Sequence, residues 1–321
     1  MEMKSLFAGR IQSYLVFHAS QGFRTDKHED NLRLFDKYCC VFKPLAAKLT
    51  QEIVEDWLAF ESAKGHLGVM CVKASVIRSF ANYLAAFGEN AYILPRGLFP
   101  QRTDYTPYIL KDDELSALFA EIDRSCQNHE CTQAVKGSYS VLFRLVYSCG
   151  LRPQEGRNAK CNDLDLDSGV LLLRETKTHN ERMVGLSVPM WNMLKKYKAR
   201  LDKVAPASEF LFPMASGKPM SKDWMGDFLA GCWRRSNPEA AKAHPRLRVY
   251  DLRHRFASEV LQRWIDDGKD IYKAIPVLRA YMGHSTLAGT LYYVHLLPER
   301  LRQSEAIDWK RLNSIIPEVN Q

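Results

Sequence analysis

Side chains of the types that handle phosphodiester bonds recur through the later part of the sequence. Arginine binds phosphate oxygens through two parallel N–H donors, and lysine or histidine can pass a proton to or from a reacting oxygen. A tyrosine oxygen can attack phosphorus and hold the phosphate covalently. Together these types supply the parts needed to cut and rejoin a phosphodiester, and the candidates are Arg152, Lys177, Arg253, His284 and Tyr293.

The first candidate, Arg152, follows a strongly apolar segment, 138–149, that predicts a buried helix. Gly150 allows a sharp turn after that helix, and Pro153 is typical of the first position of the next one. Arg152 would then lie beside the unpaired N–H groups of a helix N-terminus, where a phosphate is favoured. Glu155 could brace its guanidinium. An ordinary surface arginine near a turn is the alternative interpretation.

Lys177 lies in the polar turn 175–181 between two segments that predict β-strands, 170–173 and 183–188. The two segments therefore indicate a β-hairpin, and these are the only convincing strands in the sequence. A lysine in such a turn could reach into a DNA groove. A solvated lysine is the more common situation for this residue type in a turn.

The remaining candidates fall between residues 249 and 295. Asp251 is expected to cap a helix that carries Arg253 in its first turns, where the guanidinium could bind a phosphate bidentately. His254 points to another face, and we predict that it is structural. Tyr292 and Tyr293 end a later helix, a position where one ring commonly packs and the other is exposed.

In its order and spacing this set resembles the tyrosine recombinase (phage-type integrase) family with the two-domain, Xer-like architecture. The resemblance implies a mainly α fold with a small β-hairpin or sheet, in which an α-helical core-binding domain precedes a mixed α+β catalytic domain. The matching segments are Gly150-Leu151-Arg152-Pro153-Gln154-Glu155, Lys177, Tyr250-Asp251-Leu252-Arg253-His254, Gly283-His284 and Tyr293-Val294-His295. The resemblance covers the whole catalytic region, about 106–314.

The resemblance also implies a role for each residue in a site-specific recombinase or integrase. Arg152 and Arg253 would clamp the scissile phosphate, with His284 as a further donor. Tyr293, nine residues after His284, would attack to give a 3′-phosphotyrosine, and Lys177 would protonate the departing 5′ oxygen. Such chemistry needs no metal and no other cofactor, because the bond energy stays in the phosphotyrosine.

One position departs from the family pattern, because Tyr250 stands where the family has histidine. A tyrosine hydroxyl can still donate a hydrogen bond to a phosphate oxygen. A phenol does not exchange protons near neutral pH as an imidazole does. We therefore expect an enzyme that works more slowly. The alternatives are a DNA-binding protein of the same fold with weakened catalysis, and a DNA-relaxing enzyme like the type IB topoisomerases.

Composition agrees with a partner that is a polyanion. The 321 residues carry a formal net charge of +8, with a pI near 9.0. The resemblance implies a double-stranded DNA recombination site as partner and a homo-oligomer on DNA, from a dimer to a tetrameric synapse. The eight cysteines include no CxxC pair, which argues against a zinc site. No run of 18 apolar residues is present, so we expect a cytoplasmic protein.

The periodicity of apolar residues divides the chain into a helical first part and a mixed second part. A proline-containing stretch between them reads as a linker, whose Arg96 and Arg102 could cross a phosphate backbone or simply be solvated. A final helix could dock on a neighbouring protomer or on its own domain. The predicted segments are a leader, 1–20; a helical core-binding DNA-binding domain, 21–95; the linker, 96–107; the catalytic domain, 108–300; and a C-terminal tail, 301–321.

Overall fold

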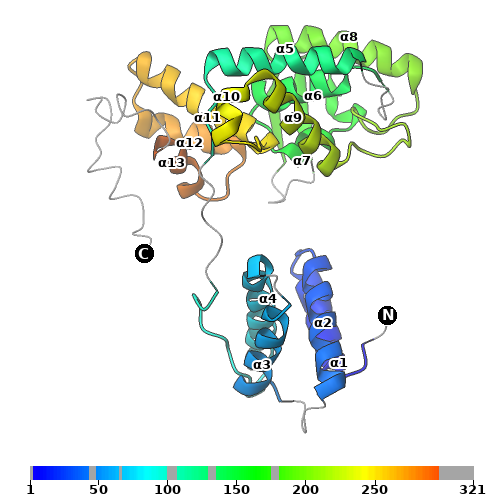
Figure 1. Ribbon diagram of the computed structural model, residues 1–321, viewed down its shortest axis with the longest axis vertical. Helices are drawn as coiled ribbons and strands as arrows, with labels where there is room; N and C mark the ends of the chain where they lie inside the picture. Colours follow the sequence, from blue (N-terminus) through cyan, green and yellow to red (C-terminus); the bar gives the residue numbers. More distant parts are fainter. Residues whose placement is uncertain are drawn as a thin grey trace. The chain divides into compact units, whose positions relative to one another are not determined.

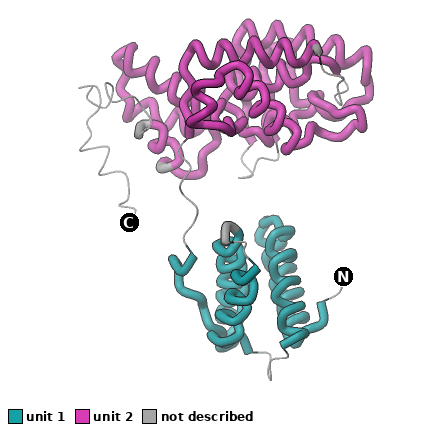
Figure 2. The backbone as a smooth tube through the Cα atoms, in the orientation of Figure 1, with its two compact units in different colours: residues 1–105 teal, residues 106–321 magenta. Residues whose placement is uncertain are grey.

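The computed structural model describes residues 3–42, 48–64, 67–99, 107–128, 135–174 and 181–295. The chain forms two compact units, residues 1–105 and 106–321 (Figure 2). The division lies within the predicted linker. Lys177, Arg102 and the C-terminal tail lie outside the described residues.

The first unit is entirely helical where it is described. Thr50 caps its third helix, since its side chain accepts a hydrogen bond from the N–H of Ile53. Phe35, Trp57 and Phe80 are fully buried in a shared core. The helices are α1 (Ala8–Ser20), α2 (Asp26–Phe42), α3 (Gln51–Ser62) and α4 (Leu67–Ala86).

The described part of the predicted leader, residues 3–20, belongs to the first unit. Helix α1 packs against α2 and α4, and the side chains of Phe7 and Ile11 are fully buried in the core of the first unit. The polar residues Arg10, Gln12 and Ser13 that interrupt the apolar pattern fall on the other face of an amphipathic helix. The burial of Phe7 and Ile11 therefore joins this segment to the helical unit.

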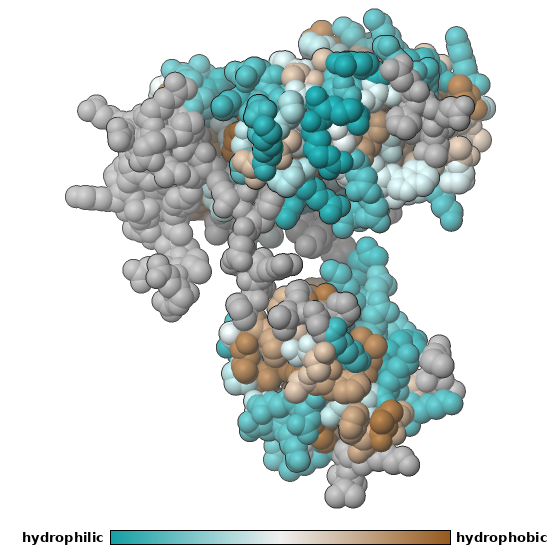
Figure 3. Space-filling model, viewed as in Figure 1, coloured by the Kyte–Doolittle hydropathy of each residue, from teal (hydrophilic) through white to brown (hydrophobic). Residues whose placement is uncertain are grey.

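Part of the first unit's surface is hydrophobic (Figure 3). The rings of Tyr38, Phe42 and Phe60 contact one another where α2 and α3 meet, with centroids 4.3–5.7 Å apart. Phe42 and the neighbouring Val41 are 56% and 72% exposed. Contiguous apolar surface of this kind is typical of a region that meets another molecule.

In the second unit, helix α6 (Ser138–Ser148) is central (Figure 1). It packs against α5, α7, α8 and α11, which explains why the sequence is apolar on nearly every side of it. The surrounding helices are α5 (Asp112–Asn128), α7 (Pro153–Arg157), α8 (Val188–Val204), α9 (Lys222–Ser236) and α10 (Pro238–Ala243).

The predicted hairpin is present and is extended by a third strand. After a short 3-10 helix (Cys161–Asp163), β1 (Leu164–Asp165), β2 (Val170–Leu173) and β3 (Arg182–Gly185) form an antiparallel sheet in the order β1-β2-β3. Leu172 pairs with Met183. The last strand ends earlier than predicted because Ser187 is the N-cap of α8, with a proline in its first turn.

The remaining helices are α11 (Val249–Asp266), α12 (Ile271–Met282) and α13 (Ala288–His295), which share a small core of their own. The helix that carries Arg253 and the one that ends near Tyr293 were predicted, whereas the short helix α10 was not. Asp251 is not the N-cap of α11. It occupies the third helical position and accepts a hydrogen bond from the N–H of Arg248 at 2.8 Å, so α11 begins earlier than predicted. No described helix has the length and apolar character to cross a membrane.

Candidate active site

The corner between α6 and α7 positions Arg152 as the sequence predicts. Gly150 has a φ of +58°, and a Cβ there would lie 2.4 Å from the ring of Phe256, so only glycine fits. Arg152 is the N-cap residue of α7, and Pro153 follows at the first helical position. Glu155 accepts hydrogen bonds from the Arg152 backbone N–H (2.8 Å) and from its Nη1 (2.7 Å). The predicted brace is therefore present.

Arg253, in the second turn of α11, is fully buried. Its Nη1 donates to the carbonyl oxygen of Gly150, and its Nη2 to that of Met282, both at 2.7 Å. Met282 is the last residue of α12 and Gly150 follows the end of α6 by two residues, so both carbonyls lie at negative helix ends that favour a buried cation. Desolvation nevertheless lowers the pKa of Arg253 from its ordinary value, and a guanidinium keeps its proton.

His284 lies directly after α12 and holds one defined tautomer. Its Nε2 is 2.9 Å from Nη2 of Arg253, which can only donate, so Nε2 accepts. Its Nδ1 therefore carries the proton and donates to Oγ1 of the fully buried Thr290 at 2.8 Å. Burial, and then the charge of Arg253, lowers the pKa of His284 to about 3. The imidazole is neutral near pH 7.

Tyr293 is covered by its surroundings, with only 2% of its surface exposed. Its ring centroid lies 5.9 Å from that of His284 and 5.4 Å from that of His254. Burial raises the pKa of Tyr293 to about 12, although the charge of Arg253 opposes the shift. The neighbouring Tyr292 is 39% exposed. One tyrosine of the pair is thus packed and the other is exposed, as expected.

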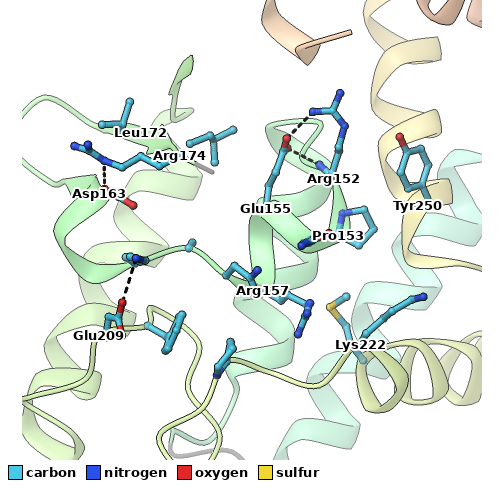
Figure 4. A pocket seen from close by; sticks show the side chains of 18 of the residues that line it. Arg152, Pro153, Glu155, Arg157, Asp163, Leu172, Arg174, Glu209, Lys222 and Tyr250 are labelled. Carbon is cyan, nitrogen blue, oxygen red and sulfur yellow. Dashed lines mark hydrogen bonds and ion pairs between the residues drawn. The ribbon is translucent and has the colours of Figure 1, made fainter. Parts of the chain in front are cut away.

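A cavity of about 800 Å³ opens beside Arg152 (Figure 4). Tyr250 lies on its wall and is 36% exposed. Basic side chains predominate among the charged groups that line it, a composition that favours a phosphate backbone. Three of them are paired with carboxylates of the same lining: Arg152 with Glu155 at 2.7 Å, Arg174 with Asp163 at 2.8 Å and Lys160 with Glu209 at 3.1 Å. The basic residues of the lining are Arg152, Arg157, Lys160, Arg174 and Lys222.

The structure brings together most of the residues that the sequence singled out. Arg152, Glu155, Arg253, His284 and Tyr293 converge from α7, α11, the end of α12 and α13. Tyr250 borders this group, with its ring centroid 5.9 Å from the Arg253 guanidinium carbon. Lys177 and Arg102 lie outside the described residues. Arg96 is exposed and belongs to the first unit.

Two residues of this cluster were not predicted. Thr290 fixes the tautomer of His284, and Arg182 binds both carboxylate oxygens of Glu155, at 2.9 and 2.8 Å. A signal for Arg182 existed in the strand pattern, because Arg182 and the fully buried Val184 share one face of β3. Nothing local marks Thr290.

Comparison with known proteins identifies the family of this chain. The model of the phage integrase family matches residues 109–300, which is more than half of the chain. The chain belongs to the phage integrase family. Its members include tyrosine recombinases, so the protein is related to DNA recombinases at the level of the family.

Individual phage integrase relatives match over most of their length. A putative integrase/recombinase, y4rB, of Sinorhizobium fredii is 28% identical over 305 residues, covering 94% of this chain and 96% of the relative. The tyrosine recombinase XerC of Staphylococcus carnosus is 26% identical over 258 residues, covering 77% and 78% of the two chains.

Solved structures share the fold. The XerH recombinase in a post-cleavage complex with its difH substrate has a TM-score of 0.62 at 17% identity, covering 89% of this chain and 79% of that one. The Tn1549 transposon integrase bound to transposon end DNA has a TM-score of 0.61 at 16% identity, covering 88% and 94%. The mainly helical fold with a small antiparallel sheet is that of this family.

Proposed function

We propose that this protein is a site-specific DNA recombinase that cuts and rejoins strands through a 3′-phosphotyrosine on Tyr293. The observation that carries the proposal is the convergence of Arg152, Arg253 and His284 with that tyrosine. Two guanidiniums at one position suit a phosphate whose charge grows in the transition state. The basic cavity beside Arg152 supports double-stranded DNA as the partner.

In the proposed reaction the phenol oxygen of Tyr293 forms a bond to phosphorus. The bond from phosphorus to the 5′ oxygen breaks, which leaves a 3′-phosphotyrosine and a 5′-hydroxyl. The phenol loses its proton and the 5′ oxygen gains one, a role that the family resemblance gives to Lys177. Rejoining reverses these steps with a different 5′-hydroxyl.

The proposed nucleophile is less accessible than Arg152 and Tyr250. Tyr293 and Arg253 are both covered, whereas the Arg152 side chain is 14% exposed and Tyr250 borders the cavity. A covered phenol cannot meet a phosphate in line, so DNA must bind first at Arg152 and Tyr250. Displacement of α13 would then uncover the nucleophile. This order would keep Tyr293 from attacking other phosphates before a site is bound.

Recombination joins strands from two sites, so we propose that the protein acts as a homo-oligomer on DNA, from a dimer to a tetramer. The exposed rings of Phe42 and Phe60 give the first unit an apolar surface suited to contacts between protomers. We also propose that Arg96 and Arg102 contact DNA, and that the first unit binds DNA as a core-binding domain.

A nicked suicide duplex that carries the candidate recombination site tests the chemistry. Cleavage near the nick releases a short fragment that carries the new 5′-hydroxyl, and its loss prevents rejoining and traps the covalent intermediate. Denaturing gels should show a DNA-linked band for the wild type and for Tyr292→Phe, and none for Tyr293→Phe. Specific binding of the site without any covalent adduct would instead support the alternative of a DNA-binding protein with weakened catalysis. Relaxation of supercoiled plasmids without regard to site would instead indicate a topoisomerase-like enzyme.

A further inference from the structure

Arg182, the first residue of β3, is bound on every side of its guanidinium. Its Nη1 and Nη2 donate to the two carboxylate oxygens of Glu155 at 2.9 and 2.8 Å. Its Nε donates to the carbonyl oxygen of Tyr281 at 2.8 Å, two residues before Gly283. The side chain is 9% exposed. A bidentate pair of this kind fixes geometry as well as charge.

Glu155 is the point at which three arginines meet. Besides Arg182, it accepts two hydrogen bonds from Arg152, and its Oε2 lies 3.9 Å from Nη1 of Arg253. Burial raises the pKa of Glu155, but the hydrogen bonds and charge of Arg182, and then those of Arg152, outweigh it and hold the pKa below its ordinary value. The carboxylate is therefore ionised, and it needs cationic partners at all times.

The same guanidinium packs against the corner that carries His284. A Cβ on Gly283 would lie 2.9 Å from Nη1 of Arg182, and Arg152 Nη2 donates to the carbonyl oxygen of Gly283. Arg182 thus contacts the brace of one candidate phosphate donor and the backbone beside another. It lies behind both and does not line the cavity.

The charges around Glu155 indicate what the loss of Arg182 would do. With Arg182 present, both oxygens of Glu155 have a partner other than the phosphate-binding arginines. Without it, the buried carboxylate would draw on Arg152 and Arg253 alone, and their positive charge would be partly neutralised. Arg152 would also be pulled toward Glu155 and away from the cavity.

We propose that Arg182 is a positioning residue, which satisfies Glu155 and supports the Gly283-His284 corner so that Arg152 and His284 meet the scissile phosphate. This inference rests on the proposed function. Arg182 itself touches neither DNA nor the reacting atoms in this account.

The test compares Arg182→Met and Arg182→Lys with the wild type in single-turnover cleavage of the suicide duplex. Arg144→Met is the matched control, because Arg144 also binds both oxygens of a carboxylate, Asp123, at 2.8 and 2.7 Å in the same unit. Each protein is assayed at saturation on two substrates, an ordinary scissile phosphate and a methylphosphonate. The methyl group removes the negative charge that the arginines must balance.

Arg182→Met should cleave the phosphate roughly 100-fold more slowly, the effect of misplacing a catalytic group, with unchanged affinity for DNA. On the methylphosphonate the loss should be clearly smaller, and Arg182→Lys should recover part of the rate on the phosphate. Arg144→Met should match the wild type on both. If Arg182→Met does not fold, Arg182→Lys carries the same comparison.

Two results would overturn the proposal. A rate equal to that of the wild type on the phosphate excludes a positioning role, and an equal loss on both substrates indicates a structural role alone. Failure of the proposed function is distinguishable, because the wild type itself would then form no adduct on the site.

Discussion

His284 illustrates how burial sets the working state of a single side chain. The imidazole is held between a guanidinium that only donates and the hydroxyl of Thr290, so its proton resides on Nδ1. Nε2 is committed to Arg253 and cannot donate to a phosphate in this arrangement. A phosphate that displaces Arg253 from His284 would face the unprotonated Nε2. That nitrogen can donate a hydrogen bond to the phosphate only after the tautomer changes or the ring gains a proton. The residue is thus coupled to the entry of the substrate.

We predict that His284 stays neutral in the folded protein from pH 8 to about pH 4, because its folded pKa is about 3. In the unfolded chain a histidine titrates near pH 6.5. The unfolded state therefore binds the extra proton between these pH values, so this group makes the fold less stable as the pH falls from 7 to 5. NMR titration of the imidazole, assigned with the spectrum of His284→Gln, measures it directly. An inflection near pH 6.5 would contradict the prediction.

Tyr293 shows the limit of motif-based prediction at this scale. Its position nine residues after His284 predicts the nucleophile, but its burial against α11 and α12 is a property of the packed domain. Likewise, the carbonyls that hold Arg253 come from Gly150 and Met282, 103 and 29 residues away in the sequence. No local pattern contains that information.

At the scale of elements, the long periodic helices and the hairpin could be predicted from the sequence, because their apolar spacing is regular. The sequence did not predict the short elements α10 and β1, because their few residues carry too little periodicity. The connection of β3 to the active site through Arg182 was also missed, since its carboxylate partner lies in α7. Such contacts depend on how the elements pack in the folded domain, which the local sequence does not specify.

Two glycine corners join these elements, and we predict that they differ in tolerance. A Cβ on Gly150 would meet the packed ring of Phe256 at 2.4 Å, whereas one on Gly283 would meet the end of the Arg182 side chain at 2.9 Å. Both have positive φ, which costs an alanine about 1–2 kcal/mol. Gly150→Ala should add a packing penalty of about 1–3 kcal/mol, so it should be the more destabilising. Urea unfolding of the full chain measures both.

The control for this pair is Gly226→Ala in α9, where a Cβ would meet nothing within 4 Å. An alanine in a helix interior should stabilise the protein by about 0.5–1 kcal/mol. Gly283→Ala should also slow cleavage, because the shift falls on Arg182 and on the His284 corner. Equal unfolding midpoints for Gly150→Ala and Gly283→Ala would contradict the prediction, because they would show that the Phe256 ring moves aside without loss of stability.

At the scale of the whole molecule, chemistry and much of the charge lie in one unit. Every described residue of the candidate site belongs to residues 106–321. The two units have separate hydrophobic cores, so each has the means to fold by itself. We therefore expect the first unit to contribute to the proposed reaction through binding and assembly.

We predict that residues 106–321 alone fold and form the covalent adduct, with DNA affinity lowered by roughly 100-fold or more because one of two linked binding modules is lost. At saturating protein the cleavage rate should stay within about tenfold of that of the full chain, since the catalytic groups are all retained. Gel-shift titration gives the affinity, and single-turnover cleavage of the suicide duplex gives the rate. A folded fragment that binds at saturation but forms no adduct would mean that residues 1–105 help to assemble the active site.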